Sequence, residues 1–372
     1  NYKYDNASNL LEQSDAVGNT IKYEYDLNGN EIKEIDENNQ AEIKEYNLDN
    51  SLKKMTTRNG DVFTYQYDVH NNVIKEMIGE NIIEYEYDKN NNLVKITKNG
   101  NIDSTRIYDE LNRVIKKDDV VYEYDIALNN GEYKEKLIDE KGNIVETIYD
   151  KAKRIKKVIN GDDETVYSYN ANGSLSKIAY SNGASEEYVY NLDNTLEELI
   201  NKNLNNTIIS KYEYEYDENN NIVKKVDEQG TTIYKYDVMN RIIEINQEGL
   251  TTSYEYDTRG NRIKESIVDQ NKSRVTTYTY NNKNQLIEKI LIVAEDSTIE
   301  QETVQYEYDL NGNEIKEKVN GQVTVENTYN ENNELVETRE QTHTAMYKYN
   351  VEGLRTKKIV DTATTQFRYD GN

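Results

Sequence analysis

The sequence predicts an all-β fold, built from tandem antiparallel β-hairpins that repeat about every 21 residues and coil into a spiral or hollow, shell-like barrel. Three observations support this prediction. Tyr followed by Asp or Asn recurs at a nearly constant interval, two different turn signals occur in most intervals, and no Pro is present to interrupt a strand. No stretch of the chain shows a sustained helical period.

The repeat is anchored by the Tyr of the Tyr-Asp or Tyr-Asn pair, which recurs at the same spacing in most of the chain. Insertions fall between anchors, as expected for loops on a regular frame. One short and one long interval flank Tyr124 and together equal two normal periods, so we interpret Tyr124 as one anchor shifted inside them. The anchors are Tyr4, Tyr25, Tyr46, Tyr67, Tyr87, Tyr108, Tyr124, Tyr149, Tyr169, Tyr190, Tyr216, Tyr236, Tyr256, Tyr280, Tyr308, Tyr329, Tyr349 and Tyr369.

Three further positions repeat with the anchor. An aromatic residue usually lies two residues before it, Gly or Asn lies four after it in 14 of the 17 copies that extend that far, and an aliphatic residue often lies seven after it. The Tyr-x-Tyr spacing places both rings on one face of a strand, Asp or Asn starts a turn, and Gly or Asn tolerates a positive φ. We expect the aliphatic residue to begin the return strand. The predicted structural anchors of the repeat are therefore Tyr25, Asp26, Gly29, Tyr67, Asp68, Tyr87, Asp88, Tyr216, Asp217, Tyr236, Asp237, Tyr256, Asp257, Gly260, Tyr308, Asp309 and Gly312.

A second turn signal, typified by Asn59-Gly60 and Asn320-Gly321, lies between many copies, so each copy contributes two strands. About 36 strands in one flat sheet would be roughly 170 Å wide at about 4.8 Å per strand. Twisted sheets of that width curl or split, so the sheet must coil. We expect Tyr rings stacked from copy to copy to supply the cohesion of this sheet.

Composition supports a thin layer that is wet on at least one side. Of the 372 residues, only 35% are hydrophobic, the mean hydropathy is −0.99, and 34 Tyr stand against 2 Phe and no Trp. The net charge of −25 favours solubility and disfavours nucleic acid and anionic lipid as partners. No Cys is available for disulfides or thiolate chemistry, and no long apolar run predicts a membrane span.

No catalytic, cofactor-binding or metal-binding residue is predicted, and the chain is not expected to be an enzyme. His70 and His343 lie far apart in the sequence, and we interpret both as solvated side chains. The segment from Asp26 to Glu31 superficially resembles part of a calcium loop, but its Gly comes fourth, so a hairpin turn is the favoured interpretation. The acidity of the chain leaves weak surface calcium binding open. Tyr stripes could stack on sugar rings, although stacking on one another is favoured.

The repeat resembles that of the YD-repeat, or Rhs, family, which includes polymorphic toxins, Tc insecticidal toxin components, wall-associated proteins and teneurins. The copies from Tyr25 to Ile32 and from Tyr256 to Ile263 carry the family's Tyr-Asp-x-x-Gly-Arg/Asn-x-aliphatic unit, and the resemblance covers the whole chain. It implies a β-sheet shell that can enclose a C-terminal toxin. It also implies that a conserved core with Asp-Pro motifs follows such repeats, and the stretch from Gly353 to Asn372 looks like the segment before it. Because the chain has no Pro, the resemblance carries over the scaffold and not the self-cleavage chemistry.

We therefore expect residues 1–372 to be a single YD-repeat array and a fragment of a larger protein, without the conserved core or a toxin domain. The expected function is a structural shell segment of a large secreted or bacterial cell-surface protein, carrying a toxin in bacterial competition. The expected partner is the remainder of its own polypeptide. The alternative is a surface adhesin or fibre that binds glycans or neighbouring cells. Free terminal strands also predict head-to-tail self-association.

Overall fold

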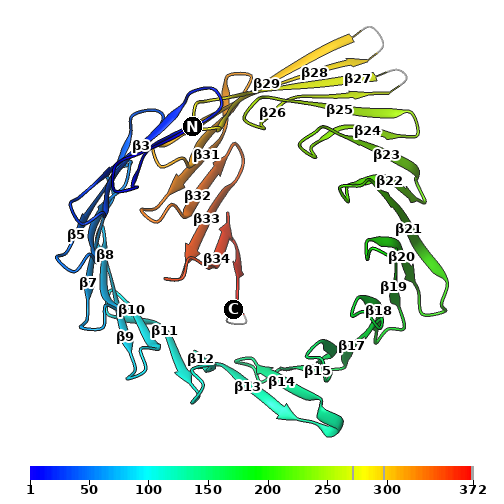
Figure 1. Ribbon diagram of the computed structural model, residues 1–372, viewed down its shortest axis with the longest axis horizontal. Helices are drawn as coiled ribbons and strands as arrows, with labels where there is room; N and C mark the ends of the chain where they lie inside the picture. Colours follow the sequence, from blue (N-terminus) through cyan, green and yellow to red (C-terminus); the bar gives the residue numbers. More distant parts are fainter. Residues whose placement is uncertain (270–271, 296–297, 370–372) are drawn as a thin grey trace. The chain divides into compact units, whose positions relative to one another are not determined.

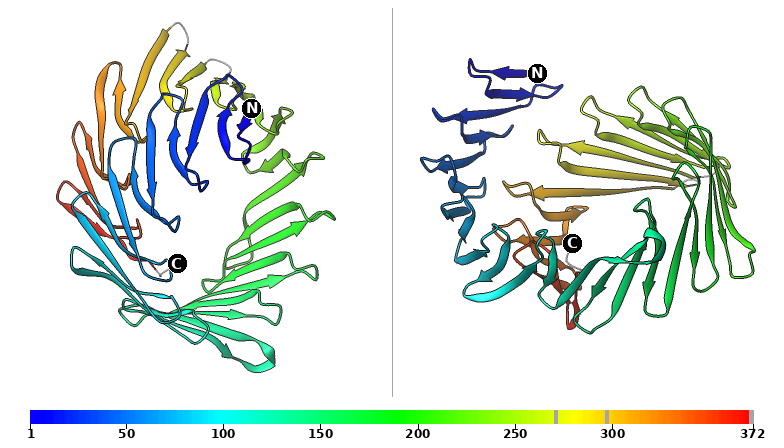
Figure 2. Two further views of the ribbon diagram at one scale, coloured as in Figure 1. Left: turned by 60° about the vertical axis from the view of Figure 1, so that its left-hand side comes forward. Right: turned by 60° about the horizontal axis from the view of Figure 1, so that its bottom comes forward.

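A computed structural model describes residues 1–269, 272–295 and 298–369. These residues form 35 β-strands in one sheet and one short 3₁₀ turn, η1 (Asn129–Gly131), and no α-helix occurs among them. Consecutive strands are joined by short turns (Figure 1), and two further views follow the same succession (Figure 2). The predicted all-β fold class is confirmed.

The strands follow one another at short intervals along the chain. The first eleven are β1 (Tyr2–Tyr4), β2 (Leu10–Ser14), β3 (Thr20–Tyr25), β4 (Glu31–Ile35), β5 (Ala41–Tyr46), β6 (Leu52–Thr56), β7 (Val62–Tyr67), β8 (Val73–Ile78), β9 (Asn81–Tyr87), β10 (Leu93–Lys98) and β11 (Asn101–Tyr108). The next fourteen are β12 (Val114–Lys117), β13 (Val120–Ala127), β14 (Tyr133–Ile138), β15 (Ile144–Tyr149), β16 (Ile155–Asn160), β17 (Asp163–Tyr169), β18 (Leu175–Tyr180), β19 (Ser185–Tyr190), β20 (Leu196–Lys202), β21 (Ile208–Tyr216), β22 (Ile222–Asp227), β23 (Gly230–Tyr236), β24 (Ile242–Gln247) and β25 (Leu250–Tyr256). The last ten are β26 (Arg262–Val268), β27 (Lys272–Tyr280), β28 (Leu286–Glu295), β29 (Thr298–Tyr308), β30 (Glu314–Val319), β31 (Gln322–Tyr329), β32 (Leu335–Glu340), β33 (Thr344–Tyr349), β34 (Arg355–Val360) and β35 (Ala363–Gln366).

Each strand whose register is described pairs antiparallel with its neighbours in sequence, as the meander predicts. The hairpin that follows Tyr25 shows the typical geometry. The Asp26 amide donates to Asn30 O at 2.9 Å, the Gly29 amide donates to Asp26 O at 3.1 Å, and Gly29 has φ +86°. This is a tight turn closed by a residue in the left-handed region. We call such turns, which follow a Tyr anchor, repeat turns, and those between copies linking turns.

The register corrects one prediction about the return strand. Tyr25 pairs with Glu31 while Glu24 pairs with Lys33, so Ile32 is the extra residue of a β-bulge. The same shift occurs at Tyr67, where Ile74 is skipped. The aliphatic residue seven after the anchor therefore does not begin the return strand. The strand begins one residue earlier, and the aliphatic position is the bulge.

Tyr124 makes the hydroxyl bond of an anchor, but the turn expected directly after it is absent. Strand β13 continues through Tyr124 to Ala127, and Asp125 is a bulge residue with φ +52°. The turn starts three residues later, where the Leu128 amide donates to Glu132 O at 2.9 Å. A turn without Asp or Asn at its first position was invisible to a search for Tyr-Asp pairs.

Burial confirms the thin layer. The buried hydrophobic residues among those described are Phe63, Ile78, Ile83, Ile96 and Val304. Strands such as β3 alternate half-buried Tyr with exposed Glu, which follows the predicted period of two. Stability must therefore come largely from the backbone ladder and from contacts that recur in every copy.

Two compact units are distinguishable. The first comprises Asn1–Thr105, Glu255–Glu265 and Lys272–Tyr369, and the second is built mainly from Arg106–Tyr254. The first unit joins two segments that are far apart in the sequence, namely the first segment (residues 1–105) and the returning segment (255–265 and 272–369).

Candidate functional site

The Asp of the repeat turn is a hydrogen-bond acceptor that holds the turn together. In the copy that starts at Asp26, Oδ1 accepts the amides of Asn28 and Asn30, both at 2.9 Å, and Oδ2 accepts Nδ2 of Asn30 at 2.9 Å. These bonds, with that from the Asn30 side chain first, lower the pKa of Asp26. The same contacts recur, at 2.7–3.0 Å, around Asp68, Asp88, Asp217, Asp237 and Asp257.

The residue four after this Asp is a partner that the sequence analysis missed. It is Asn30 in one copy and Arg241 in another, where Nε donates to Asp237 Oδ2 at 2.7 Å. Both side chains can donate to a carboxylate. The recurrence of Asn or Arg five residues after the Tyr anchor was the available signal. Because the carboxylate accepts three internal hydrogen bonds, the segment from Asp26 to Glu31 is a hairpin turn.

The anchor Tyr donates its hydroxyl to the neighbouring copy. Tyr25 donates to Leu10 O at 3.0 Å, and Tyr67 donates to Leu52 O at 2.8 Å. Each accepting carbonyl belongs to the first residue of the return strand of the copy before. The same bond is made by Tyr46, Tyr87, Tyr124, Tyr169, Tyr216, Tyr236, Tyr280, Tyr308, Tyr349 and Tyr369.

This recurring bond corrects the role predicted for the rings. Stacked pairs are described for Tyr133 with Tyr149, at 4.8 Å between centroids, and for Tyr122 with Tyr124, at 6.4 Å. The hydroxyl-to-carbonyl bond recurs far more often. Burial first, then the charge of Glu135 and its hydrogen bond, raise the pKa of Tyr149 to about 12, so its hydroxyl remains protonated at neutral pH.

Asparagine side chains join successive repeat turns. Asn50, which has φ +66°, accepts Nδ2 of Asn28 at 3.1 Å and of Asn30 at 2.8 Å from the preceding copy. Asn240 accepts from Asn221 at 2.9 Å in the same way. Asn at this position therefore supplies both the left-handed conformation and an acceptor. Where the position is Gly, as at Gly29, Gly260 and Gly312 (φ +86°, +93° and +98°), only the conformation is supplied.

The two segments of the first unit meet at a seam, which we define as the contacts between linking turns of the first segment and repeat turns of the returning segment. Asn59 lies at its centre. Its amide donates to Asn311 Oδ1 at 3.0 Å, its Nδ2 donates to Asp309 Oδ2 at 2.9 Å, and its Oδ1 accepts the amide of Leu310 at 3.0 Å. The hydrogen bonds across the seam join residues 248 to 263 apart in sequence. The chain thus returns to its own first hairpins after many copies of the repeat.

Charged side chains flank this centre. Lys283 forms an ion pair with Asp36, whose residue is 5% exposed, and Arg58 lies 3.4 Å from the same carboxylate oxygen. Burial alone would raise the pKa of Asp36, but Lys283 and the amides of Gln40 and Asn38 outweigh burial and lower it.

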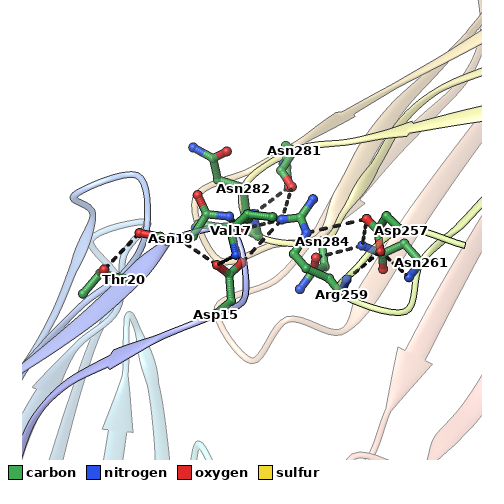
Figure 3. Close-up of polar contacts among 12 residues, drawn as sticks. Asp15, Val17, Asn19, Thr20, Asp257, Arg259, Asn261, Asn281, Asn282 and Asn284 are labelled. Carbon is green, nitrogen blue, oxygen red and sulfur yellow. Dashed lines mark hydrogen bonds and ion pairs between the residues drawn. The ribbon is translucent and has the colours of Figure 1, made fainter. Parts of the chain in front are cut away.

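Arg259 makes the second ionic contact of the seam (Figure 3). Its guanidinium points from the turn of Asp257 toward Asp15, with Nη1 at 3.8 Å from Asp15 Oδ2, and it donates to Asn281 O at 3.3 Å. Beside it, Asn19 Nδ2 donates to Asn282 O at 3.3 Å. Five charged groups thus lie on a surface of contact between two acidic segments.

An apolar contact completes the seam. Val351 packs against the buried cluster of Phe63, Ile78, Ile83 and Ile96, and its amide donates to Asp103 Oδ2 at 3.1 Å. Val351 is the second residue of a repeat turn, a position with no assigned role in the sequence analysis.

Two shallow cavities lie along the seam, of about 310 Å³ beside Asn59 and Tyr329 and about 220 Å³ beside Arg58 and Asn332. A third, of about 520 Å³, lies in the groove between the turns of Asp68 and Asp88 and includes His70. Residues with amide or carboxylate side chains make up most of the lining of the two cavities along the seam. Within the described residues, no group of three or more His, Asp or Glu has a geometry suited to a metal ion.

The two His residues lie in separate turns. The His70 amide donates to Asp68 Oδ1 at 2.8 Å. His343 is not merely solvated, because its Nδ1 lies 2.8 Å from Asp361 Oδ2, and this contact lowers the pKa of Asp361. Among the described helices, none is long and apolar enough to span a membrane.

These features agree with the YD-repeat shell that the sequence resembles. Residues 45–127 match the family model described as Teneurin YD-shell. The chain is similar in structure to TcdB2-TccC3, with a TM-score of 0.70 and 14% identity over 96% of this chain and 22% of that one. It is also similar to TcdB2-TccC3 without the hypervariable C-terminal region (0.59, 15%, 96% and 23%) and to the Photorhabdus luminescens Tc holotoxin pore (0.55, 14%, 96% and 22%).

The predicted resemblance to YD-repeat proteins is confirmed by the family match over residues 45–127, and the fold of the chain is similar to that of these solved structures, as the sequence predicted. The chain spans about a fifth of the length of these solved relatives. No curated protein matched the sequence.

Proposed function

We propose that this chain is a structural segment of the β-shell of a large secreted or cell-surface YD-repeat protein, and that the shell carries the remainder of its own polypeptide, including a toxin used in bacterial competition. The seam is the observation that carries this proposal. The array binds its own first hairpins through side chains that are specific to those copies. An array that contacts its own first hairpins is better suited to form a wall around another polypeptide than to form an extended fibre.

The repeat geometry supports a mechanical role without catalysis. The anchors Tyr25, Asp26 and their equivalents direct their polar atoms into turn and inter-copy hydrogen bonds, which leaves them little capacity to bind a substrate. We propose that they are structural, that residues 1–372 form one array, and that no cofactor is required.

Limited proteolysis of the natural polypeptide that contains this chain tests the proposal. The polypeptide downstream of the array should resist trypsin while the array is intact, and should be digested once the seam is weakened by substitution of Lys283 and Arg259. Digestion of the downstream polypeptide at the same rate in both forms would contradict a carrying role.

A glycan array separates this function from the adhesin alternative. The purified chain should bind no glycan selectively if the repeats form only a wall. Selective binding that is lost when exposed Tyr residues are replaced would favour an adhesin instead.

A further inference from the structure

Some repeat hairpins are closed at their open end by a clip, which we define as two hydrogen bonds between the residue after the second strand and a residue 17 positions earlier. The Asn99 amide donates to Ile82 O at 2.8 Å, and Asn99 Oδ1 accepts the Ile82 amide at 2.8 Å. Asn320 makes the same two bonds with Thr303, at 2.7 and 3.0 Å. Asn99 and Asn320 have φ +52° and +50°, so one residue supplies both the left-handed conformation and the side-chain acceptor.

A third clip has a carboxylate in place of the carboxamide. Asp361, with φ +51°, donates its amide to Thr344 O at 3.0 Å, and its Oδ1 accepts the Thr344 amide at 3.2 Å. These bonds close the open end of the hairpin of β33 and β34, directly beyond the pair of Ala345 with Val360. The repeat turn at the other end of this hairpin carries Val351, which contacts the first segment at the seam.

The residue before the clipped amide binds the second polar atom of the clip side chain. In the first clip this residue is Asn81, whose Oδ1 accepts Nδ2 of Asn99 at 3.2 Å, so both partners are carboxamides. In the third clip it is His343, whose Nδ1 lies 2.8 Å from Asp361 Oδ2. Imidazole gains a proton as the pH falls through about 6.5, whereas a carboxamide does not titrate. The same position in the repeat thus holds a neutral pair in one copy and a titratable pair in another.

His343 is the charged group that acts on Asp361. The hydrogen bond from His343 is the first cause of the lowered pKa of Asp361, ahead of the Thr344 amide, and burial opposes both. Because its pKa is lowered, Asp361 is a carboxylate throughout the range in which imidazole titrates. On the adjoining strand β32, Arg339 binds Glu337 at 2.9 Å. The other charged residues of β32, β33 and β34 are Glu340, Lys348, Arg355, Lys357 and Lys358.

We propose that Asp361 and His343 form a pH-operated clip, which tightens the open end of the β33–β34 hairpin as the pH falls and loosens it as the pH rises. Protonated His343 adds an ion pair to the contact with Asp361. This ion pair is present at low pH and is lost as the imidazole loses its proton. The two side chains are 59% and 48% exposed, so the effect is modest and local to this hairpin.

Amide hydrogen exchange of the full chain at about pH 5.5 and about pH 8 tests the proposal. After correction for the pH dependence of intrinsic exchange, the Thr344 amide should be protected roughly threefold more strongly at the lower pH, as expected for an exposed ion pair. The Ile82 amide is the internal control, because its clip consists of carboxamides, and its protection should be equal at both pH values.

Two variants assign the pH dependence to the clip. Asp361→Asn installs the residue type found at Asn99 and Asn320, so the hairpin should persist and the protection of the Thr344 amide should no longer depend on pH. His343→Gln should also abolish this dependence. The matched control is His70→Gln, which removes the other His of the chain and should leave the dependence intact.

Equal protection of the Thr344 amide at both pH values in the unsubstituted chain would overturn the proposal. A dependence of the same size at the Ile82 amide would also overturn it, because the effect would then not belong to the clip. Persistence of the dependence in Asp361→Asn or in His343→Gln would do the same. The proposed shell function is tested separately, since its protease-protection assay does not depend on this clip.

Discussion

The substitution Tyr216→Phe removes the hydroxyl of an anchor Tyr and keeps its aromatic ring. The hydroxyl donates to Leu196 O at 2.8 Å, which links the end of β21 to the start of β20. Tyr216 is half-buried, and burial is the main cause of its raised pKa. Loss of one such hydrogen bond costs about 0.5–1.5 kcal/mol. We expect a loss near the middle of that range, because water can reach part of the vacated carbonyl.

Backbone amide hydrogen exchange is the appropriate assay. Repeats contact only their neighbours, so a local defect should loosen adjacent strands before it changes global unfolding. A loss of about 1 kcal/mol corresponds to a roughly fivefold increase in exchange rate. That increase should be confined to the amides of β20, β21 and β22.

Tyr190→Phe is the matched control. Tyr190 is also an anchor at the end of a strand of the second unit, and its hydroxyl makes no hydrogen bond to the part of the chain that is described. The control should leave exchange in its own hairpins unchanged. Equal effects of the two substitutions, or no effect of Tyr216→Phe, would show that the ring and not the hydroxyl joins the copies.

Three further predictions concern turns and acid. Lys153 has φ +61°, so Lys153→Gly should raise the free energy of unfolding by about 1 kcal/mol in urea titration. Gly183→Ala should lower it by about 1–3 kcal/mol, because the added Cβ would lie 2.9 Å from Leu204 Cβ at φ +84°. The pKa values of Asp36 and Asp309 are lowered in the folded state, so their stabilising contribution is complete above the ordinary value of 3.8 and is lost as the pH falls through the lowered values. Urea midpoints should therefore stay level from pH 7 to about 4 and fall below it, and a level midpoint at about pH 3 would contradict the ion pairing of the seam.

Interactions between residues that are close in sequence made the strands and turns of the fold predictable. The position four residues after the anchor has a positive φ in 16 of 17 copies, including Ser8 and Lys153, where the residue is neither Gly nor Asn. The exception is Leu128, which lies four residues after Tyr124, where the strand continues, and adopts an extended conformation. Strand period and turn chemistry act within a few residues, so a single copy contains the information needed to form its hairpin.

The seam was beyond such reasoning, because it depends on how the twist of many strands accumulates. No pattern within one copy indicates that Asn59 will meet Asp309, which lies 250 positions further along the chain. A partial signal was nevertheless present. The third residue of the repeat turn is Lys or Arg at Arg259 and Lys283 and in none of the other turns that begin at a Tyr-Asp or Tyr-Asn pair. These two cations are the ones that meet carboxylates of the first segment, Asp15 and Asp36.

That coincidence leads to a prediction about Lys283. Lys283→Met leaves the carboxylate of Asp36 buried with only Arg58 beside it. Removal of one partner from a buried ion pair costs about 3–5 kcal/mol, and the remaining cation should reduce this to about 2 kcal/mol. The amides of Asn59 and Leu310, which bond across the seam, should then exchange at least tenfold faster.

A double-mutant cycle separates the ion pair from other effects of the substitution. In the unsubstituted chain the amides of Asn38 and Gln40 donate to Asp36 Oδ1 at 2.9 and 2.8 Å. The side-chain oxygen of the variant Asp36→Asn can accept the same two hydrogen bonds, so the turn should persist. In the double variant neither member of the Lys283–Asp36 pair is charged, and Arg58 keeps its ion pair with Glu34. The loss of stability should therefore be smaller than the sum of the single losses by about 1–2 kcal/mol. Lys141→Met is the control, since Lys141 is the exposed third residue of a turn that begins at an Asp in the second unit. This substitution should change the free energy of unfolding by less than about 0.5 kcal/mol. Additive losses of stability in the cycle, or equal losses from Lys141→Met and Lys283→Met, would contradict this prediction. The Lys283 cation would then not determine which copies of the repeat meet at the seam. The register of the seam would have to follow from strand twist alone.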